Sequence, residues 1–205
     1  MHSVVHRWPA VIVAGMLSLA LSGCGSLQAP VPVETAAAAC VGWSKPKNAT
    51  RVTTAAYSFL LPKSWVNKTN SEMNTSGALS LYADKSTMKT SYVDNISVTS
   101  TTVGTNMSVK EYELALVNEV KNGGFTVVKF SDPVVHTPIS LGGIKAAYIT
   151  AKAKIKQPKV TLVLTVLGVT DRQNRYAIGI GSLAGRPSTK AAFLKDLRCS
   201  WTWAD

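Results

Sequence analysis

Few side chains in this 205-residue chain are suited to covalent or acid–base chemistry: it holds three cysteines and three histidines. A thiol can act as a nucleophile, form a disulfide or bind a metal, and an imidazole can move a proton near neutral pH. Cys24 lies near the N-terminus, while Cys40 and Cys199 lie at the two ends of the sequence that follows. The surroundings of these three thiols indicate what each one does.

Cys24 directly follows an apolar segment that begins shortly after Arg7. The 12-residue stretch from Ala10 to Leu21 is too short for a membrane-spanning helix, because it reaches only about 18 Å at about 1.5 Å per residue. A basic start, an apolar middle and small residues at the end are typical of a secretory signal. The tetrapeptide Leu21-Ser22-Gly23-Cys24 resembles the lipobox of bacterial lipoproteins. That resemblance implies cleavage after Gly23 and a diacylglyceryl group on Cys24; an ordinary cleaved signal with a chance cysteine is the alternative.

The residues after Cys24 read as a tether that leads into one domain. Residues 25–39 contain Pro30 and Pro32 among small residues and show no core-facing period. We therefore expect a signal peptide at 1–23, a lipidated cysteine and flexible tether at 24–39, and a globular domain at 40–205. The formal net charge of +11 becomes +10 on cleavage, since Arg7 is the only charged residue removed. The predicted location is the extracytoplasmic face of the cell membrane, held there by acyl chains.

Once Cys24 is lipidated, Cys40 and Cys199 are the two remaining thiols. Exported compartments permit disulfides, so we predict a Cys40–Cys199 bridge that clamps the first segment of the domain to the last. Two unpaired buried thiols are the alternative.

The histidines offer little for catalysis or metal binding. His2 and His6 leave with the signal, so His136 alone remains, in a loop flanked by prolines. A Ser–His–acid triad would have to use that residue, and the sequence contains no Gly-x-Ser-x-Gly elbow. The glycines at 179, 181 and 185 are better explained by a curved sheet than by a dinucleotide site. We expect a non-enzyme with no metal and no cofactor.

Lysines gather on one predicted strand. Lys152, Lys154 and Lys156 share a strand face, with Lys145 and Lys159 nearby. Such a stripe either is a solvated surface that prevents strand addition or binds an anionic partner. In an exported protein that partner is a lipid headgroup, a phosphate-bearing wall polymer or an acidic protein, and nucleic acid is disfavoured by the compartment. The arginines at 172, 175 and 186 are also expected near one end of the same strands.

Composition and periodicity indicate the elements that position these residues. Hydrophobic residues make up 46% of the chain and charged residues 16%, which excludes a disordered chain. Ser108 and Glu111 form a capping-box pattern for a helix ending near Lys121, and Ser188 is a candidate cap for a last helix over 189–198. Consecutive strands with short links predict an antiparallel meander. The strands are expected at 57–61, 78–83, 92–103, 125–130, 145–156, 160–169 and 176–180.

The order of several short patterns resembles one family. Tyr57-Ser58-Phe59 is followed by Pro62-Lys63-Ser64-Trp65, a Gly142-Gly143-Ile144-Lys145-Ala146 turn precedes the long hairpin, and the final helix runs into Ser200-Trp201. In this order they resemble the PsbP-like superfamily, which includes Mog-type, DcrB-type and LpqN-type proteins. The resemblance implies an α+β fold of a single domain: a curved antiparallel sheet (meander) with helices on its faces, as an αβα sandwich. It brings no shared catalytic residues.

Three functional hypotheses follow. The leading one is a membrane-anchored extracytoplasmic lipoprotein with a non-enzymatic binding or accessory role in the cell envelope. The alternative is a carrier of a small apolar or lipid-like ligand in a pocket under the sheet. The third is an envelope enzyme built around His136.

Overall fold

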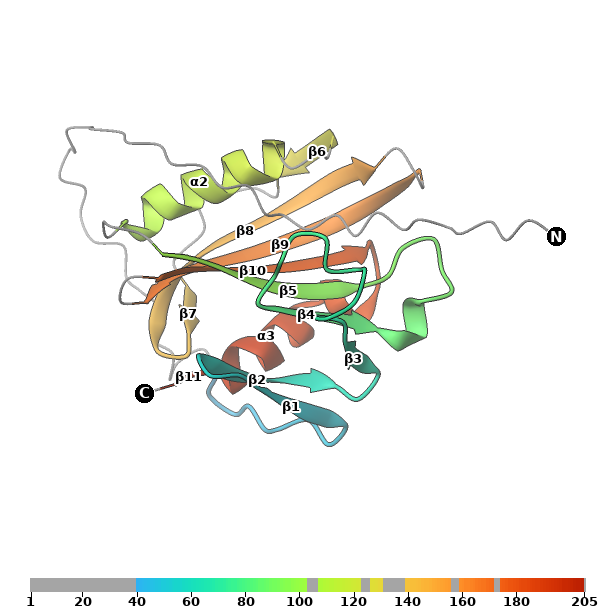
Figure 1. Ribbon diagram of the computed structural model, residues 1–205. Helices are drawn as coiled ribbons and strands as arrows, with labels where there is room; N and C mark the ends of the chain where they lie inside the picture. Colours follow the sequence, from blue (N-terminus) through green and yellow to red (C-terminus); the bar gives the residue numbers. More distant parts are fainter. Residues whose placement is uncertain are drawn as a thin grey trace.

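The computed structural model describes residues 40–204, apart from 103–106, 123–125, 131–138, 156–158 and 172–173. Its strands form two antiparallel sheets (Figure 1). The large sheet has the order β3-β4-β5-β10-β9-β8-β6, with β7 also paired to β8. In that order its strands are β3 Trp65–Asn67, β4 Ser80–Asp84, β5 Asn95–Thr102, β10 Asn174–Leu183, β9 Val160–Asp171, β8 Ile144–Ile155, β6 Thr126–Phe130 and β7 Ile139–Leu141. The small sheet consists of β1 Ala49–Thr53, β2 Tyr57–Pro62 and β11 Thr202–Trp203.

The predicted meander lies at the centre of the large sheet. β8 pairs antiparallel with β9, and β9 with β10, over ten residue pairs each. Side chains alternate between the two faces of a strand, so every second residue of β8 points to the same side. Ala147, Ile149, Ala151 and Ala153 are all buried and belong to one hydrophobic cluster. The alternation that predicts this strand therefore also predicts its buried face.

The helix α2 (Val109–Asn122) covers that face of the sheet (Figure 1). Leu116 and Val120 on its inner side are fully buried. Gly168 of β9 allows the close approach, because a Cβ at that position would lie 2.8 Å from Leu116 Cδ1 and 2.9 Å from Tyr112 Cε1. Real Cβ atoms do not make such contacts, so the absence of a side chain at Gly168 sets the spacing between helix and sheet.

The helix α3 (Ala191–Ser200) and the small sheet cover the opposite face. Aromatic rings fill much of this layer: Phe59 of β2 stacks on Trp201 with ring centroids 4.8 Å apart, and Tyr57 stacks on Trp201 at 4.9 Å. Leu197 of α3 packs in the same cluster as Ile178 of β10. The layers are therefore α2, the large sheet, and α3 with the small sheet, which confirms the predicted α+β sandwich.

The two predicted helix caps have different outcomes. At α2 the capping box is present, since Ser108 N–H donates to Glu111 Oε2 at 2.8 Å and Glu111 N–H donates to Ser108 Oγ at 3.3 Å. The Ser108 hydroxyl, which donates to the same carboxylate at 2.7 Å, and the Ser108 N–H hold the pKa of Glu111 below its ordinary value. The prediction that Ser188 caps the last helix is wrong. Ser188 lies in the short helix η2 (Pro187–Thr189) and donates to buried Asp94, while Lys190 occupies the cap position of α3 with no side-chain bond.

Four short strands, β1, β3, β7 and β11, are not among the predicted ones. Strands of two to five residues show little periodicity, and these four are held by the longer strands beside them. Within the described residues, no helix is both long enough and apolar enough to cross a membrane.

Candidate functional site

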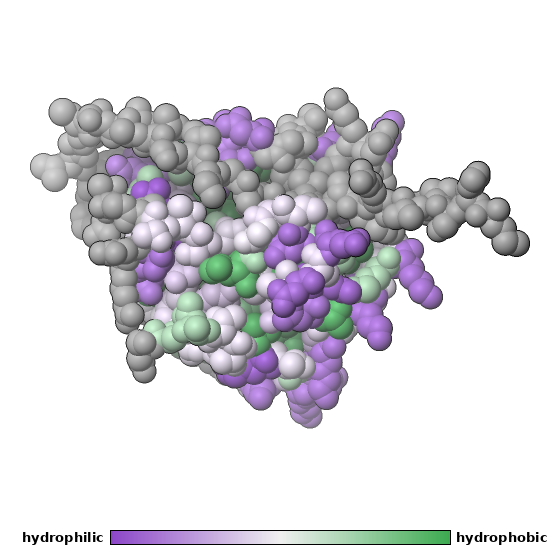
Figure 2. Space-filling view, viewed as in Figure 1, coloured by the Kyte–Doolittle hydropathy of each residue, from purple (hydrophilic) through white to green (hydrophobic). Residues whose placement is uncertain are grey.

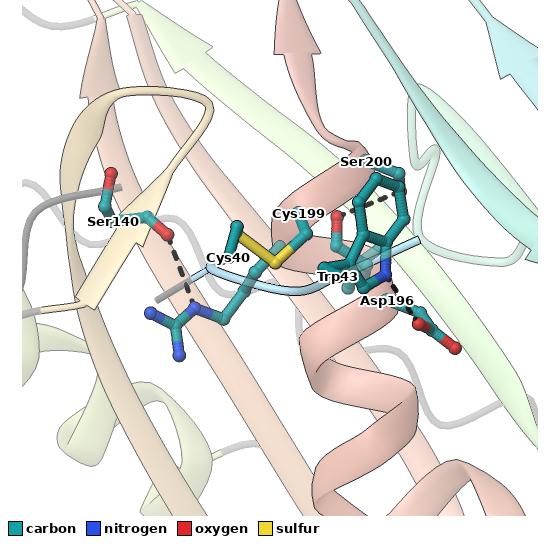
Figure 3. The surroundings of a disulfide bond; sticks show 8 residues. Cys40, Trp43, Ser140, Asp196, Cys199 and Ser200 are labelled. Carbon is teal, nitrogen blue, oxygen red and sulfur yellow. Dashed lines mark hydrogen bonds between the residues drawn. A yellow bond between two sulfur atoms is a disulfide. The ribbon is translucent and has the colours of Figure 1, made fainter. Parts of the chain in front are cut away.

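The first described residue of the domain is bonded to its last helix. Cys40 and Cys199 form a disulfide with Cα atoms 5.6 Å apart (Figure 3), which confirms the predicted bridge. A second contact lies beside it: Trp43 Nε1 donates to Asp196 Oδ1 at 2.8 Å. Within one turn of Cys199, Ser200 Oγ accepts from the backbone N–H of Leu60 in β2. The segment where a tether would join the domain is thus fixed to α3.

The predicted lysine patch divides into two parts. Lys152 and Lys154 are exposed on one face of β8, and Lys159 is exposed in the turn that follows. Lys145 lies on the opposite face, the one that α2 covers, and lines a pocket with Tyr112. Seven residues of strand also separate Lys145 from Lys152, a span of about 23 Å. Grouping Lys145 with the others is therefore incorrect, because both strand parity and strand length keep them apart.

Register adds a further lysine position beside the pair. Lys129 of β6 is the direct register partner of Lys152. The register of the two strands thus puts two lysine positions opposite each other at this edge of the sheet. Lys156 lies outside the described residues, as do Cys24 and His136.

The arginines do not gather at one end of the meander. Arg175 lies at the start of β10 and Arg186 follows its end, so the length of the strand separates them. Arg172 lies outside the described residues. The prediction that Arg175 and Arg186 lie near one end of the meander is wrong, because they lie near opposite ends of β10.

Arg186 is instead part of a buried polar network that sequence reasoning missed. Its guanidinium donates to Asp94 Oδ1 at 2.5 Å and to the Tyr92 carbonyl at 2.9 Å. Asp94, only 1% exposed, also accepts at Oδ2 from Ser182 Oγ and Ser188 Oγ, each at 2.6 Å. All four residues therefore have partners inside the protein, and the network joins the start of β5 to the loop before α3. A buried aspartate 88 to 94 residues from its side-chain partners gives no local signal in the sequence.

The glycine pattern near this network has a packing role. A Cβ on Gly181 would lie 2.5 Å from the Tyr92 hydroxyl, and one on Gly179 would lie 3.3 Å from Ser97 Oγ. Side chains at these positions would displace their neighbours. The two glycines belong to β10, where neighbouring side chains leave no room for a side chain of their own. This agrees with the packing role in a curved sheet that is expected from the sequence.

A pocket of about 430 Å³ opens at the N-terminal end of α2. Apolar side chains of Met107, Val109 and Ile144 line it together with Lys145 and Thr170. The pocket lies at one end of the large sheet and is open to solvent on one side. The space between α2 and the sheet is filled by the packed cluster around Leu116.

Glu119 of α2 is the titratable group with the clearest effect on pH dependence. Burial raises its pKa from an ordinary 4.5 to about 7, and nearby Arg175 only partly offsets this. Between these two pH values the unfolded chain has lost the proton while the folded one keeps it, so stability falls as pH rises from 4.5 to 7.

We expect the gain in unfolding free energy from Glu119→Gln to be about 1–2 kcal/mol larger at pH 8 than at pH 5. This value is reduced for the partial exposure of the side chain. Urea unfolding of the variant and the wild type at both pH values measures this. Asn118→Gln, an exposed neighbour on the same helix, is the control. A stabilisation of equal size at pH 5 and pH 8 would contradict the raised pKa.

Two solved structures share this architecture. The solution structure of cyanobacterial PsbP (CyanoP) from Synechocystis sp. PCC 6803 matches with a TM-score of 0.52 at 13% identity, over 89% of this chain and 98% of that one. The crystal structure of LpqN, involved in cell envelope biogenesis of Mycobacterium tuberculosis, matches with a TM-score of 0.53 at 12% identity, over 85% and 100%. No protein-family model and no curated protein matches the chain. The structural likeness shows a PsbP-like fold, as the sequence resemblance predicts.

Proposed function

We propose that the chain is a lipoprotein, anchored through Cys24 on the extracytoplasmic face of the membrane, with an accessory binding role in the cell envelope. The observation that carries this proposal is the Cys40–Cys199 disulfide. Structural disulfides belong to oxidising, exported compartments, so the bridge supports export independently of the signal sequence. LpqN has the same fold and is involved in envelope biogenesis, which supports an envelope role.

A non-enzymatic role is favoured by what the polar side chains do. Asp94, Ser182 and Ser188 are buried and bonded to one another, and Arg186 is bonded to Asp94. A catalytic group needs a free face toward a substrate. The most connected polar cluster of the described residues therefore holds the fold together.

The exposed face of β8 is the proposed contact with an anionic envelope component. Lys152 and Lys154 lie side by side on it, and the register of Lys129 adds a third basic position. We prefer this accessory role to that of a ligand carrier, because packed side chains fill the layer beneath the sheet.

The anchor is tested by Cys24→Ser in the native cell. Wild-type protein is expected in the membrane fraction after a high-salt wash and labelled with radioactive fatty acid. The variant loses the label completely, because a hydroxyl does not replace the thiolate in thioether formation. Ser26→Ala, two residues further along the tether, is the control and keeps both label and membrane retention. A labelled Cys24→Ser variant, or an unlabelled wild type, would contradict the proposal.

A further inference from the structure

Exposed lysines from three separate segments meet at one edge of the domain. The backbone N–H of Lys63 donates to the Asn48 carbonyl at 3.1 Å, and that of Lys85 donates to the Ser64 carbonyl at 2.8 Å. These bonds place the segment before β1, the β2–β3 turn and the short helix η1 (Lys85–Thr87) next to one another. Lys45, Lys47, Lys63 and Lys85 are all exposed there, and we call them the basal lysines.

The positive charge of this edge is poorly balanced. Among the described residues, none of the basal lysines makes an ion pair. Asp84 is an acidic neighbour whose carboxylate bonds to the backbone N–H and the hydroxyl of Ser86 rather than to a lysine. Arg51 of β1 adds a further exposed cation. Figure 2 shows hydrophilic residues along the lower and right margins of the molecule, over the start of β1 and around η1.

The basal lysines lie close to where the tether joins the domain. Residues 40–48 run along the lower margin beside β1 (Figure 1), so Lys45 and Lys47 follow Cys40 within seven residues. Val41, next to the disulfide, is 75% exposed and apolar. The residues from Cys24 to Cys40 reach at most about 55 Å when extended and about 22 Å as a flexible coil. An anchored domain therefore keeps this edge near the bilayer.

We propose that the basal lysines seat the domain on the anionic lipid headgroups of the membrane that anchors it. This rests on the proposed lipid anchor and adds a second attachment with a defined orientation. Each lysine near an anionic bilayer strengthens binding roughly fivefold, and acyl chains combined with a basic patch hold a protein more firmly than acyl chains alone. In Figure 1 the end of β8 lies at the upper right and β1 at the lower margin, so the part of β8 that carries Lys152 and Lys154 lies away from the basal edge.

The experiment uses the mature chain, residues 24–205, with Cys24→Ser so that no acyl chain contributes. Sedimentation measures its partition onto phosphatidylcholine vesicles with and without about 30% phosphatidylglycerol, an anionic fraction at which polybasic binding operates. One variant changes all four basal lysines to Glu. The matched control changes Lys145, Lys152, Lys154 and Lys159 to Glu, with the same total charge. Thermal unfolding verifies that both variants fold.

We expect salt-sensitive binding to the anionic vesicles and none to the neutral ones. The basal variant should lose at least about a hundredfold in partition, and the control less than about tenfold. Equal losses in the two variants would reduce the effect to net charge and overturn the proposal, as would a wild-type chain that does not bind. Fatty-acid labelling of the unmodified protein is measured in parallel: label without lysine-dependent binding refutes this surface alone, whereas absence of label refutes the anchor.

Discussion

Replacing Cys40 and Cys199 together with alanine is expected to lower the free energy of unfolding by about 3–5 kcal/mol. The bridge closes a sequence separation of 159 residues, and cross-linking so long a loop removes much of the conformational freedom of the unfolded chain. Chain entropy alone gives about 5 kcal/mol for a loop of this length, which is an upper value. Equilibrium unfolding in guanidinium measures the difference.

The control for this prediction is Trp43→Phe, which removes the indole bond to Asp196 and leaves the disulfide. It should cost about 1 kcal/mol, the contribution of one hydrogen bond. An unfolding free energy unchanged by the double cysteine variant would contradict the prediction. Alkylation of two free thiols in the native, non-reduced protein would refute the bridge itself.

Asp94→Ala is expected to destabilise the fold by about 3–5 kcal/mol. Removal of this carboxylate leaves the Arg186 guanidinium partly buried without its charged partner, and takes an acceptor from Ser182 and Ser188. The cost is large because the orphaned groups are in the interior, where water cannot replace the lost bonds.

A double-mutant cycle with Arg186→Met tests the origin of that cost. If the unpaired guanidinium accounts for it, Arg186→Met in the Asp94→Ala background should recover about 1–3 kcal/mol. Urea unfolding of the wild type, the two single variants and the double variant provides the four values. Strictly additive losses would show that the two side chains do not act as a pair.

Sequence patterns predicted the structural features that depend on residues close together in the chain. The alternation of Ala147 to Ala153, the capping box of Ser108 and Glu111, and the two domain cysteines each carry their signal within a few residues or in residue type. Pairing of Cys40 with Cys199 needed only the export context. The order of such patterns was enough to predict the PsbP-like fold at 13% identity or less to the solved structures.

What sequence reasoning missed depends on contacts between distant segments. Ser188 looks like a helix cap, but Asp94 competes for its hydroxyl and binds it more strongly as a buried charge. The basal lysines are spread over 40 residues of sequence, and only the backbone bonds at Asn48 and Ser64 bring them to one edge. Lys145 was misplaced for the opposite reason: closeness in sequence suggested a shared surface that strand parity forbids.

The position of the disulfide also decides how the domain bears mechanical load. A pull on the chain before Cys40 passes through the sulfur–sulfur bond directly into the C-terminal end of α3. Strand β1 follows Cys40 and lies inside the closed loop, so tension from outside cannot peel it from β2 residue by residue. Traction at the attachment point is thus carried by the disulfide and α3 rather than by the β1–β2 pairing.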